Sequence, residues 1–122
     1  MCHTQYRVCV APDREPLDLH VQELRRGTVV LACLELLRRP AYGYALLETL
    51  EERGFRVDAN TLYPLLRRLE SQGLLECEWN TEDSRPRKFY RCTTAGRAVL
   101  RGLRQEWADL TTAIDDLTQE KR

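Results

Sequence analysis

Apolar residues recur at helical spacing through the first half of the chain. Over residues 17–39 they return every three or four positions, which predicts a first helix that stops at Pro40. Gly27 lies inside this span and marks either the true start of the helix or a weak point in it. Residues 41–44 form a tight connector, and a short second helix is expected to end before Gly54.

The clearest helical pattern lies between Asp58 and Gly73. Leucines at 62, 65, 66 and 69 follow the spacing of one helix face without a miss. Asp58 is expected to cap the start of this third helix, and Gly73 to close its end. Because the leucines occupy only one side, the helix buries one face and leaves the other in water.

Beyond Gly73 the apolar residues alternate with polar ones, and this change of period predicts strands instead of a helix. The alternation covers residues 75–79 and again 88–92. Between these two stretches, residues 80–86 are polar and include a proline, as expected for a turn. The sequence therefore predicts a β-hairpin whose turn forms a wing.

A long final helix is expected to start after a cap at Thr93 or Thr94. Its apolar residues step alternately by three and four positions, which is the heptad pattern of helices that pack against one another. The members of this heptad seam are Leu100, Leu103, Trp107, Leu110, Ile114 and Leu117.

The order of three helices, a hairpin and a helix is that of a winged helix-turn-helix with an added terminal helix. We expect a mainly α fold with a small β-hairpin. We divide the chain into a flexible N-terminal arm at residues 1–16, a winged helix-turn-helix DNA-binding domain at 17–93 and a C-terminal dimerisation helix at 94–122.

Composition narrows the class of protein. The 122 residues are 43% hydrophobic and 31% charged, which is ordinary for a globular protein, and no apolar stretch is long enough to span a membrane. The start has no secretory signal pattern, so we expect a cytoplasmic protein associated with the nucleoid, with its five cysteines as free thiols. Nineteen basic and nineteen acidic residues cancel, so any contact with nucleic acid must come from a local patch.

Two surfaces are candidates for that patch. In helix-turn-helix proteins the second helix of the motif enters the major groove, with its N-terminal residues on the bases. The outward residues of the third helix that suit this role are Asn60, Thr61, Tyr63, Pro64, Arg67, Arg68 and Ser71. The wing carries four cations and no anion between residues 84 and 91, namely Arg85, Arg87, Lys88 and Arg91. These side chains suit phosphate contacts that weaken with salt, although an ordinary solvated hairpin would also carry such charges.

The heptad seam lies at the chain end, after a three-helix core that already has enough leucines. A second copy of the chain is its natural cover, and a symmetric pair would present two third helices to adjacent turns of DNA. Trp107 either packs in that dimer or forms one wall of a pocket for a flat effector. Sequence motifs of catalysis, cofactor binding and metal binding are missing, so we expect no enzyme and no metal site.

Several linked motifs make the chain resemble the PadR family of transcriptional regulators over about residues 24–118. They are Tyr42-Gly43-Tyr44, residues 60–70, residues 73–75, Trp79, residues 87–91 and residues 93–96. The resemblance implies a homodimeric repressor whose third helix reads a palindromic operator and whose wing holds the DNA backbone or minor groove. It further implies that the last helix dimerises. The short single C-terminal helix resembles that of a compact subfamily, in which some members bind planar drugs between tryptophans at the dimer centre, and Trp107 falls at that position.

The predicted DNA contacts are Tyr42, Tyr44, Asn60, Thr61, Tyr63, Pro64, Arg67, Arg68, Arg85, Arg87, Lys88 and Tyr90. We expect double-stranded operator DNA as the partner and release by a small-molecule effector. Two alternatives stay open. One is a winged-helix module that binds proteins and no DNA. The other is a regulator that responds to thiol oxidation, because a turn centred near residues 84 and 85 would place Cys77 opposite Cys92.

Overall fold

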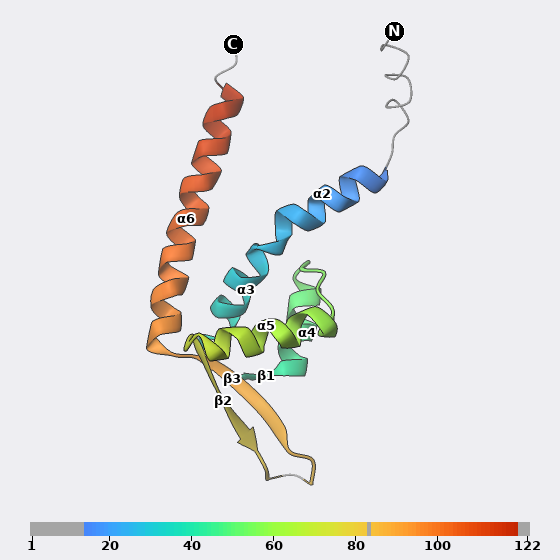
Figure 1. Ribbon diagram of the computed structural model, residues 1–122, viewed down its shortest axis with the longest axis vertical. Helices are drawn as coiled ribbons and strands as arrows, with labels where there is room; N and C mark the ends of the chain where they lie inside the picture. Colours follow the sequence, from blue (N-terminus) through green and yellow to red (C-terminus); the bar gives the residue numbers. More distant parts are fainter. Residues whose placement is uncertain (1–13, 83, 120–122) are drawn as a thin grey trace.

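The chain folds into a small helical body from which a hairpin and two helices project (Figure 1). The computed structural model describes residues 14–82 and 84–119. The predicted succession of helices, hairpin and long terminal helix is confirmed. The elements in chain order are α2 (Arg14–Arg26), α3 (Thr28–Leu36), β1 (Ala41–Tyr42), α4 (Gly43–Glu52), α5 (Ala59–Ser71), β2 (Leu75–Asn80), β3 (Arg87–Cys92) and α6 (Thr94–Gln119).

The helix expected over residues 17–39 is two helices in the structure, separated at Gly27. The Thr28 hydroxyl donates a hydrogen bond of 2.6 Å to the carbonyl of Arg25, so it satisfies one acceptor at the break. α2 begins at Arg14, inside the segment that the sequence assigned to the arm. Pro16 favoured an arm in the sequence, but a proline is well tolerated in the first turn of a helix. The rest of the predicted arm, residues 1–13, lies outside the described residues.

The hydrophobic core lies where α3, α4 and α5 meet the sheet and the start of α6. The leucine stripe of α5 is confirmed as its buried face, because none of its four leucines is more than 7% exposed. Each fully buried leucine contributes roughly 1.5–3 kcal/mol to folding, so this stripe fixes the rotation of α5 about its own axis. The core side chains are Cys33, Leu34, Leu37, Leu46, Leu50, Val57, Leu62, Leu65, Leu66, Leu69, Leu75, Tyr90, Cys92 and Leu100.

The sheet has three antiparallel strands in the order β1-β3-β2. The hairpin was predicted, but β1 was not, because the connector before α4 was expected to be irregular. β1 has only two residues, Ala41 and Tyr42, which pair with Tyr90 and Phe89. Two residues show no periodicity, and their partners lie far along the chain, so local sequence carries no signal of this strand. The pairing joins the start of α4 to the wing, which we define as residues 75–92.

The register of the hairpin corrects the predicted cysteine pair. Cys77 lies opposite Tyr90, and Cys92 lies opposite Leu75. The turn is centred one residue earlier than expected, which moves the partner of Cys77 by two positions. The Cys77 thiol instead donates to a Glu70 carboxylate oxygen at 3.0 Å, and the Cys92 thiol donates to the Leu34 carbonyl at 3.3 Å.

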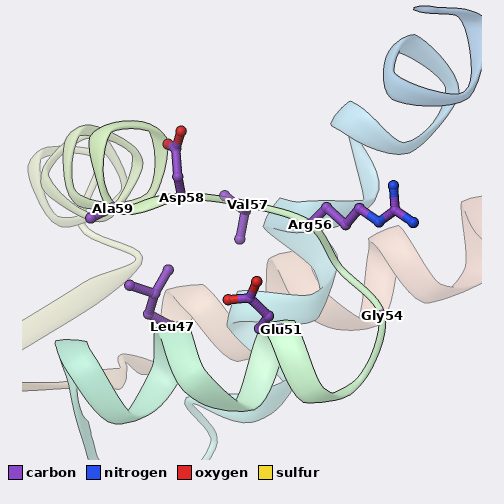
Figure 2. Close-up of a pocket in the computed structure, with 7 residues that line it drawn as sticks. All are labelled: Leu47, Glu51, Gly54, Arg56, Val57, Asp58 and Ala59. Atoms are coloured by element: carbon purple, nitrogen blue, oxygen red, sulfur yellow. The ribbon is translucent and has the colours of Figure 1, made fainter. Parts of the chain in front are cut away.

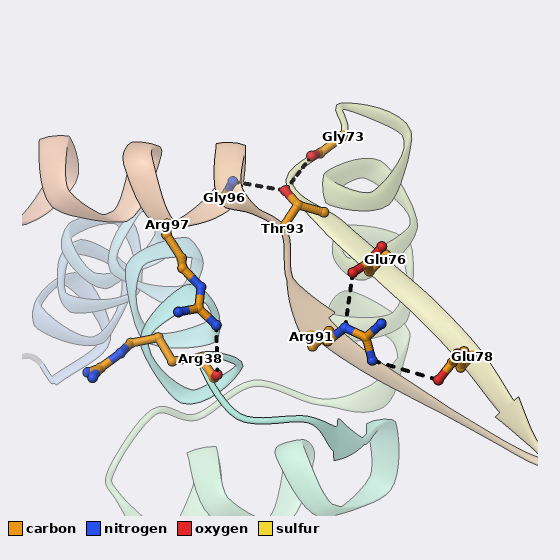
Figure 3. Close-up of polar contacts among 8 residues, drawn as sticks. All are labelled: Arg38, Gly73, Glu76, Glu78, Arg91, Thr93, Gly96 and Arg97. Atoms are coloured by element: carbon orange, nitrogen blue, oxygen red, sulfur yellow. Dashed lines mark hydrogen bonds and ion pairs between the residues drawn. The ribbon is translucent and has the colours of Figure 1, made fainter.

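The start of α6 is fixed tightly against the turn that follows α5 (Figure 3). The Thr93 hydroxyl accepts a hydrogen bond from the Gly96 amide at 3.0 Å and donates one to the Gly73 carbonyl at 2.6 Å. Gly96 is buried, and a Cβ placed on it would lie 2.1 Å from the carbonyl oxygen of Leu74. The direction in which α6 leaves the body is therefore set by backbone contacts.

Burial of Cys33 makes the folded state sensitive to alkaline pH. Desolvation, together with the neighbouring Cys92, raises the pKa of the Cys33 thiol from 9.0 to about 12. Between these values the unfolded chain releases a proton that the folded state retains, so stability is complete below about pH 9 and falls as the pH rises. We expect the free energy of unfolding to drop by about 1.4 kcal/mol between pH 8 and pH 10 through this thiol.

Urea unfolding at a series of pH values measures this effect, with a Cys33→Ala variant as the control. The variant lacks the titrating thiol. All other groups that titrate at alkaline pH are present in both proteins, so their effects cancel when the two free energies of unfolding are subtracted. Equal pH slopes in the two proteins would contradict the expected role of Cys33.

Candidate nucleic-acid interface

The side of α5 opposite the leucine stripe is open to solvent. Asp58 caps the helix as predicted, because its carboxylate accepts a hydrogen bond of 3.0 Å from the Thr61 amide. Arg67 and Arg68 of this face form no ion pair within the described part of the chain. This face therefore carries two exposed cations among uncharged side chains. The exposed residues from the predicted set are Asn60, Thr61, Pro64, Arg67 and Arg68.

Tyr63 differs from its neighbours because it is half-buried. Its ring packs against Gly43 at the start of α4, where an added Cβ would lie 2.7 Å from the Tyr63 Cε1 atom. Gly43 therefore leaves the space that this ring fills. The structure gives Tyr63 a packing role between α4 and α5, which the sequence did not indicate.

Tyr42, Tyr44 and Arg87 come together on the outer face of the sheet. The two tyrosine rings stack with centroids 5.6 Å apart. The Arg87 guanidinium carbon lies 5.0 Å from the Tyr42 centroid and 5.9 Å from that of Tyr44, and its Nη1 donates to the Tyr44 hydroxyl at 3.1 Å. We call these two rings the tyrosine platform. A guanidinium held on aromatic faces is well suited to a phosphate, since its planar donors are already oriented.

Two further residues support the tyrosine platform and were missed by the sequence analysis. The Asn80 side-chain amide donates a hydrogen bond of 2.6 Å to the Tyr42 hydroxyl. The Phe89 and Tyr42 rings form a T-shaped pair with a centroid distance of 5.8 Å. Both contacts depend on the pairing of β1 with β3, so only knowledge of that strand pair would have revealed them.

Arg91 and Lys88 of the wing lie close to carboxylates of the same chain. Arg91 contacts Glu76 at 3.0 Å and Glu78 at 3.7 Å on the neighbouring strand (Figure 3). Lys88 lies 3.8 Å from a Glu70 oxygen of α5. The patch of four cations inferred from the sequence is thus partly neutralised by carboxylates that lie outside residues 84–91. Arg85 is exposed near the tip of the hairpin.

Tyr90 is a correction to the predicted DNA contacts. Its side chain is only 4% exposed and belongs to the core, and burial raises the pKa of its hydroxyl. Alternation along β3 places Tyr90 on the same side as Cys92, facing the helices. A residue in this position cannot reach DNA, so we remove it from the interface.

The heptad seam of α6 divides into two parts. Leu100 is 4% exposed and lies in the core, so its assignment to a dimer interface was wrong, and Leu103 is half-buried against the same core. The later members lie on the part of α6 that projects from the body (Figure 1). These exposed members, which are between 51% and 69% accessible, are Trp107, Leu110, Ile114 and Leu117.

α2 projects from the same side of the body (Figure 1). It also exposes apolar side chains. Leu17, Leu19 and Leu24 are each more than 60% exposed. Large apolar side chains exposed on two projecting helices are typical of a protein-protein interface. No helix in the described part of the chain has the length and apolarity needed to cross a membrane.

Two surface hollows flank α5. One of about 580 Å³ lies at the corner between α4 and α5, where Val57 points toward Leu47 and Glu51 and Asp58 points away (Figure 2). The other, of about 760 Å³, lies between α2 and α5. Trp107 lines neither hollow. Neither of these two hollows is therefore the effector pocket that the sequence predicted beside Trp107.

Comparisons of the sequence and of the fold with known proteins both identify transcriptional regulators as relatives. The model of the family described as "Transcriptional regulator PadR-like family" matches residues 30–102. A transcriptional regulator from Mycobacterium tuberculosis is 38% identical over 95 residues, which cover 77% of this chain and 89% of that protein. The crystal structure of a PadR family transcriptional regulator from Eggerthella lenta has a TM-score of 0.84 and 49% identity, covering 89% of this chain and 96% of the other. A PadR-like transcription factor from Bacteroides fragilis has a TM-score of 0.69 and 33% identity, covering 79% and 95%.

Proposed function

The chain belongs to the PadR-like family of transcriptional regulators, and from this premise we propose that it is a homodimeric repressor of a palindromic operator. In this proposal α5 reads bases in the major groove, and Arg87 on the tyrosine platform holds the DNA backbone. The proposal rests above all on the outward face of α5, where polar and basic side chains stand opposite a fully buried leucine stripe. Residues 17–93 would form the DNA-binding domain, and residues 94–122 the dimerisation helix.

The dimer is supported by the exposed apolar residues of α6 and α2. A second copy related by two-fold symmetry would cover both surfaces with the same two surfaces of the partner, because an isologous interface uses the same patch on both subunits. The half-buried position of Leu103 and the exposure of Trp107 suggest that the dimer contact begins between these two residues.

Release by a small planar effector is the proposed control of DNA binding. Trp107 is 51% exposed on the projecting part of α6, so a two-fold interface would bring two copies of its ring toward a shared site. The thiol alternative has less support. Cys77 and Cys92 are not opposite each other, and burial raises the pKa of both thiols, which keeps them protonated and poorly reactive.

Fluorescence anisotropy tests DNA binding directly. The purified protein is titrated against its own upstream promoter DNA and a scrambled duplex over a range of salt concentrations. We expect tight binding to the promoter alone. Arg67→Ala should reduce the free energy of promoter binding by about 1–3 kcal/mol and relax the sequence preference. Arg87→Ala should weaken binding to both duplexes and lower the salt dependence of the affinity by about one counterion.

Arg101→Ala is the matched control, because Arg101 is exposed on α6 and lies on the helix side opposite the heptad seam. It should leave both affinities unchanged. Equal and weak binding of the wild-type protein to both duplexes would contradict the repressor proposal and favour a protein partner.

A further inference from the structure

A polar cluster joins the inner face of the wing to the last turns of α5. One oxygen of the Glu70 carboxylate accepts a hydrogen bond from the Cys77 thiol of β2 at 3.0 Å. The other oxygen lies 3.8 Å from the Lys88 ammonium of β3. A single side chain of α5 therefore contacts both strands of the hairpin.

The Lys88 side chain is enclosed by aromatic rings and is only 28% exposed. Its ammonium lies 5.3 Å from the Tyr90 centroid and 5.9 Å from the Trp79 centroid. Burial lowers the pKa of Lys88, but Tyr90, Cys77 and Glu70 together outweigh this effect and the pKa is raised. Lys88 thus remains charged beside Glu70.

The cluster lies between the two parts of the proposed DNA interface. Arg87 and Lys88 are adjacent in β3, so their side chains point to opposite faces of the sheet. Arg87 lies on the outer tyrosine platform, whereas Lys88 faces α5. Rotation of the hairpin about its base would move Arg87 relative to the exposed face of α5, and the contact between Lys88 and Glu70 opposes that rotation.

We propose that Glu70 and Lys88 are positioning residues that hold the wing at a fixed angle to α5, so that DNA affinity depends on this pair although neither residue touches DNA. This inference rests on the proposed function. It replaces the expectation that Lys88 binds a phosphate directly.

The test compares the full-length wild-type protein with Glu70→Gln, Lys88→Met and the exchanged variant Glu70→Lys/Lys88→Glu in promoter-DNA titrations. Each single variant should bind about three- to tenfold more weakly, and the exchanged variant should recover most of the loss because the ion pair is restored. Any decrease in the salt dependence of Lys88→Met should also appear in Glu70→Gln, because both variants release the wing that carries Arg87. A direct phosphate contact predicts the opposite: Glu70→Gln would bind at least as tightly as the wild type, the exchanged variant would stay weak, and Lys88→Met would lose about one counterion.

Hydrogen exchange of residues 75–92 separates this inference from the proposed function. Exchange should become faster in both single variants and return to the wild-type rate in the exchanged variant, whether or not the protein recognises its promoter. Unchanged exchange in the single variants would overturn the positioning role. Failure of the wild type to distinguish promoter from scrambled DNA would overturn the repressor proposal alone.

Glu76→Gln is the matched control for both measurements. It removes a carboxylate from the outer face of the same hairpin, where Glu76 contacts Arg91 of the wing and not α5. Neither DNA affinity nor the exchange rate near α5 should change. Thermal unfolding of every variant shows whether the fold is retained.

Discussion

Replacing Leu110 and Ile114 with glutamate is expected to produce a folded monomer whose affinity for operator DNA falls at least about 100-fold. Both side chains are more than half exposed on the projecting part of α6, so the single chain does not need them for its core. In a two-fold dimer, four such side chains would be buried, contributing roughly 6–12 kcal/mol in total at 1.5–3 kcal/mol each. Buried carboxylates would remove this contribution and add a desolvation cost.

Sedimentation velocity measures the dimer, and anisotropy with promoter DNA measures the affinity. Ala108→Glu/Thr112→Glu is the control, because these residues lie on the other side of α6 and add the same charge. The control should remain dimeric with unchanged DNA affinity. A dimer that persists with glutamates at both seam positions would rule out the proposed interface.

Gly96→Ala is expected to destabilise the fold by at least about 3 kcal/mol, near the upper end of the cost of overpacking. The added Cβ would lie 2.1 Å from the Leu74 carbonyl oxygen. This same oxygen accepts a hydrogen bond of 3.1 Å from the Thr93 amide. Neither partner is a flexible side chain, so relief of the clash requires α6 to shift away from the body. Urea unfolding followed by circular dichroism measures the loss.

Gly102→Ala in the same helix provides a direct comparison. Nothing lies within 4 Å of a Cβ placed there, so alanine should stabilise the protein by roughly 0.5–1 kcal/mol through its higher helix propensity. The two substitutions are chemically identical and are expected to have opposite effects. A similar effect at both positions would mean that the contact between Gly96 and Leu74 does not hold α6 in place.

The spacing of apolar residues predicted those parts of the fold in which the apolar positions of one element are also its buried positions. The leucine stripe of α5 and the alternation of the hairpin each carry several residues that obey one period, so both were found. β1 was missed because two residues cannot display a period. The sequence left open whether Gly27 marks the true start of the helix or a weak point in it, because apolar residues continue at helical spacing on both sides of the break.

The candidate interface was less predictable because it depends on which residues face each other across elements. Tyr42 and Tyr44 were named from the family resemblance, but their contact with Arg87 arises from the pairing of β1 with β3. The assignment of Tyr90 was wrong although its burial could have been inferred, since alternation places it on the side of Cys92. Leu100 fits the heptad spacing, but spacing alone does not distinguish a partner chain from the protein's own core.

The two-sided construction of α5 has a consequence for how such a regulator changes its target. Its four leucines account for the folding role of the helix, whereas the outward side chains make few contacts within the chain. Substitutions among the outward positions should therefore alter base preference at little cost in stability. If α5 reads the operator as proposed, selection or a combinatorial library could change the base preference of this protein while its core stays the same.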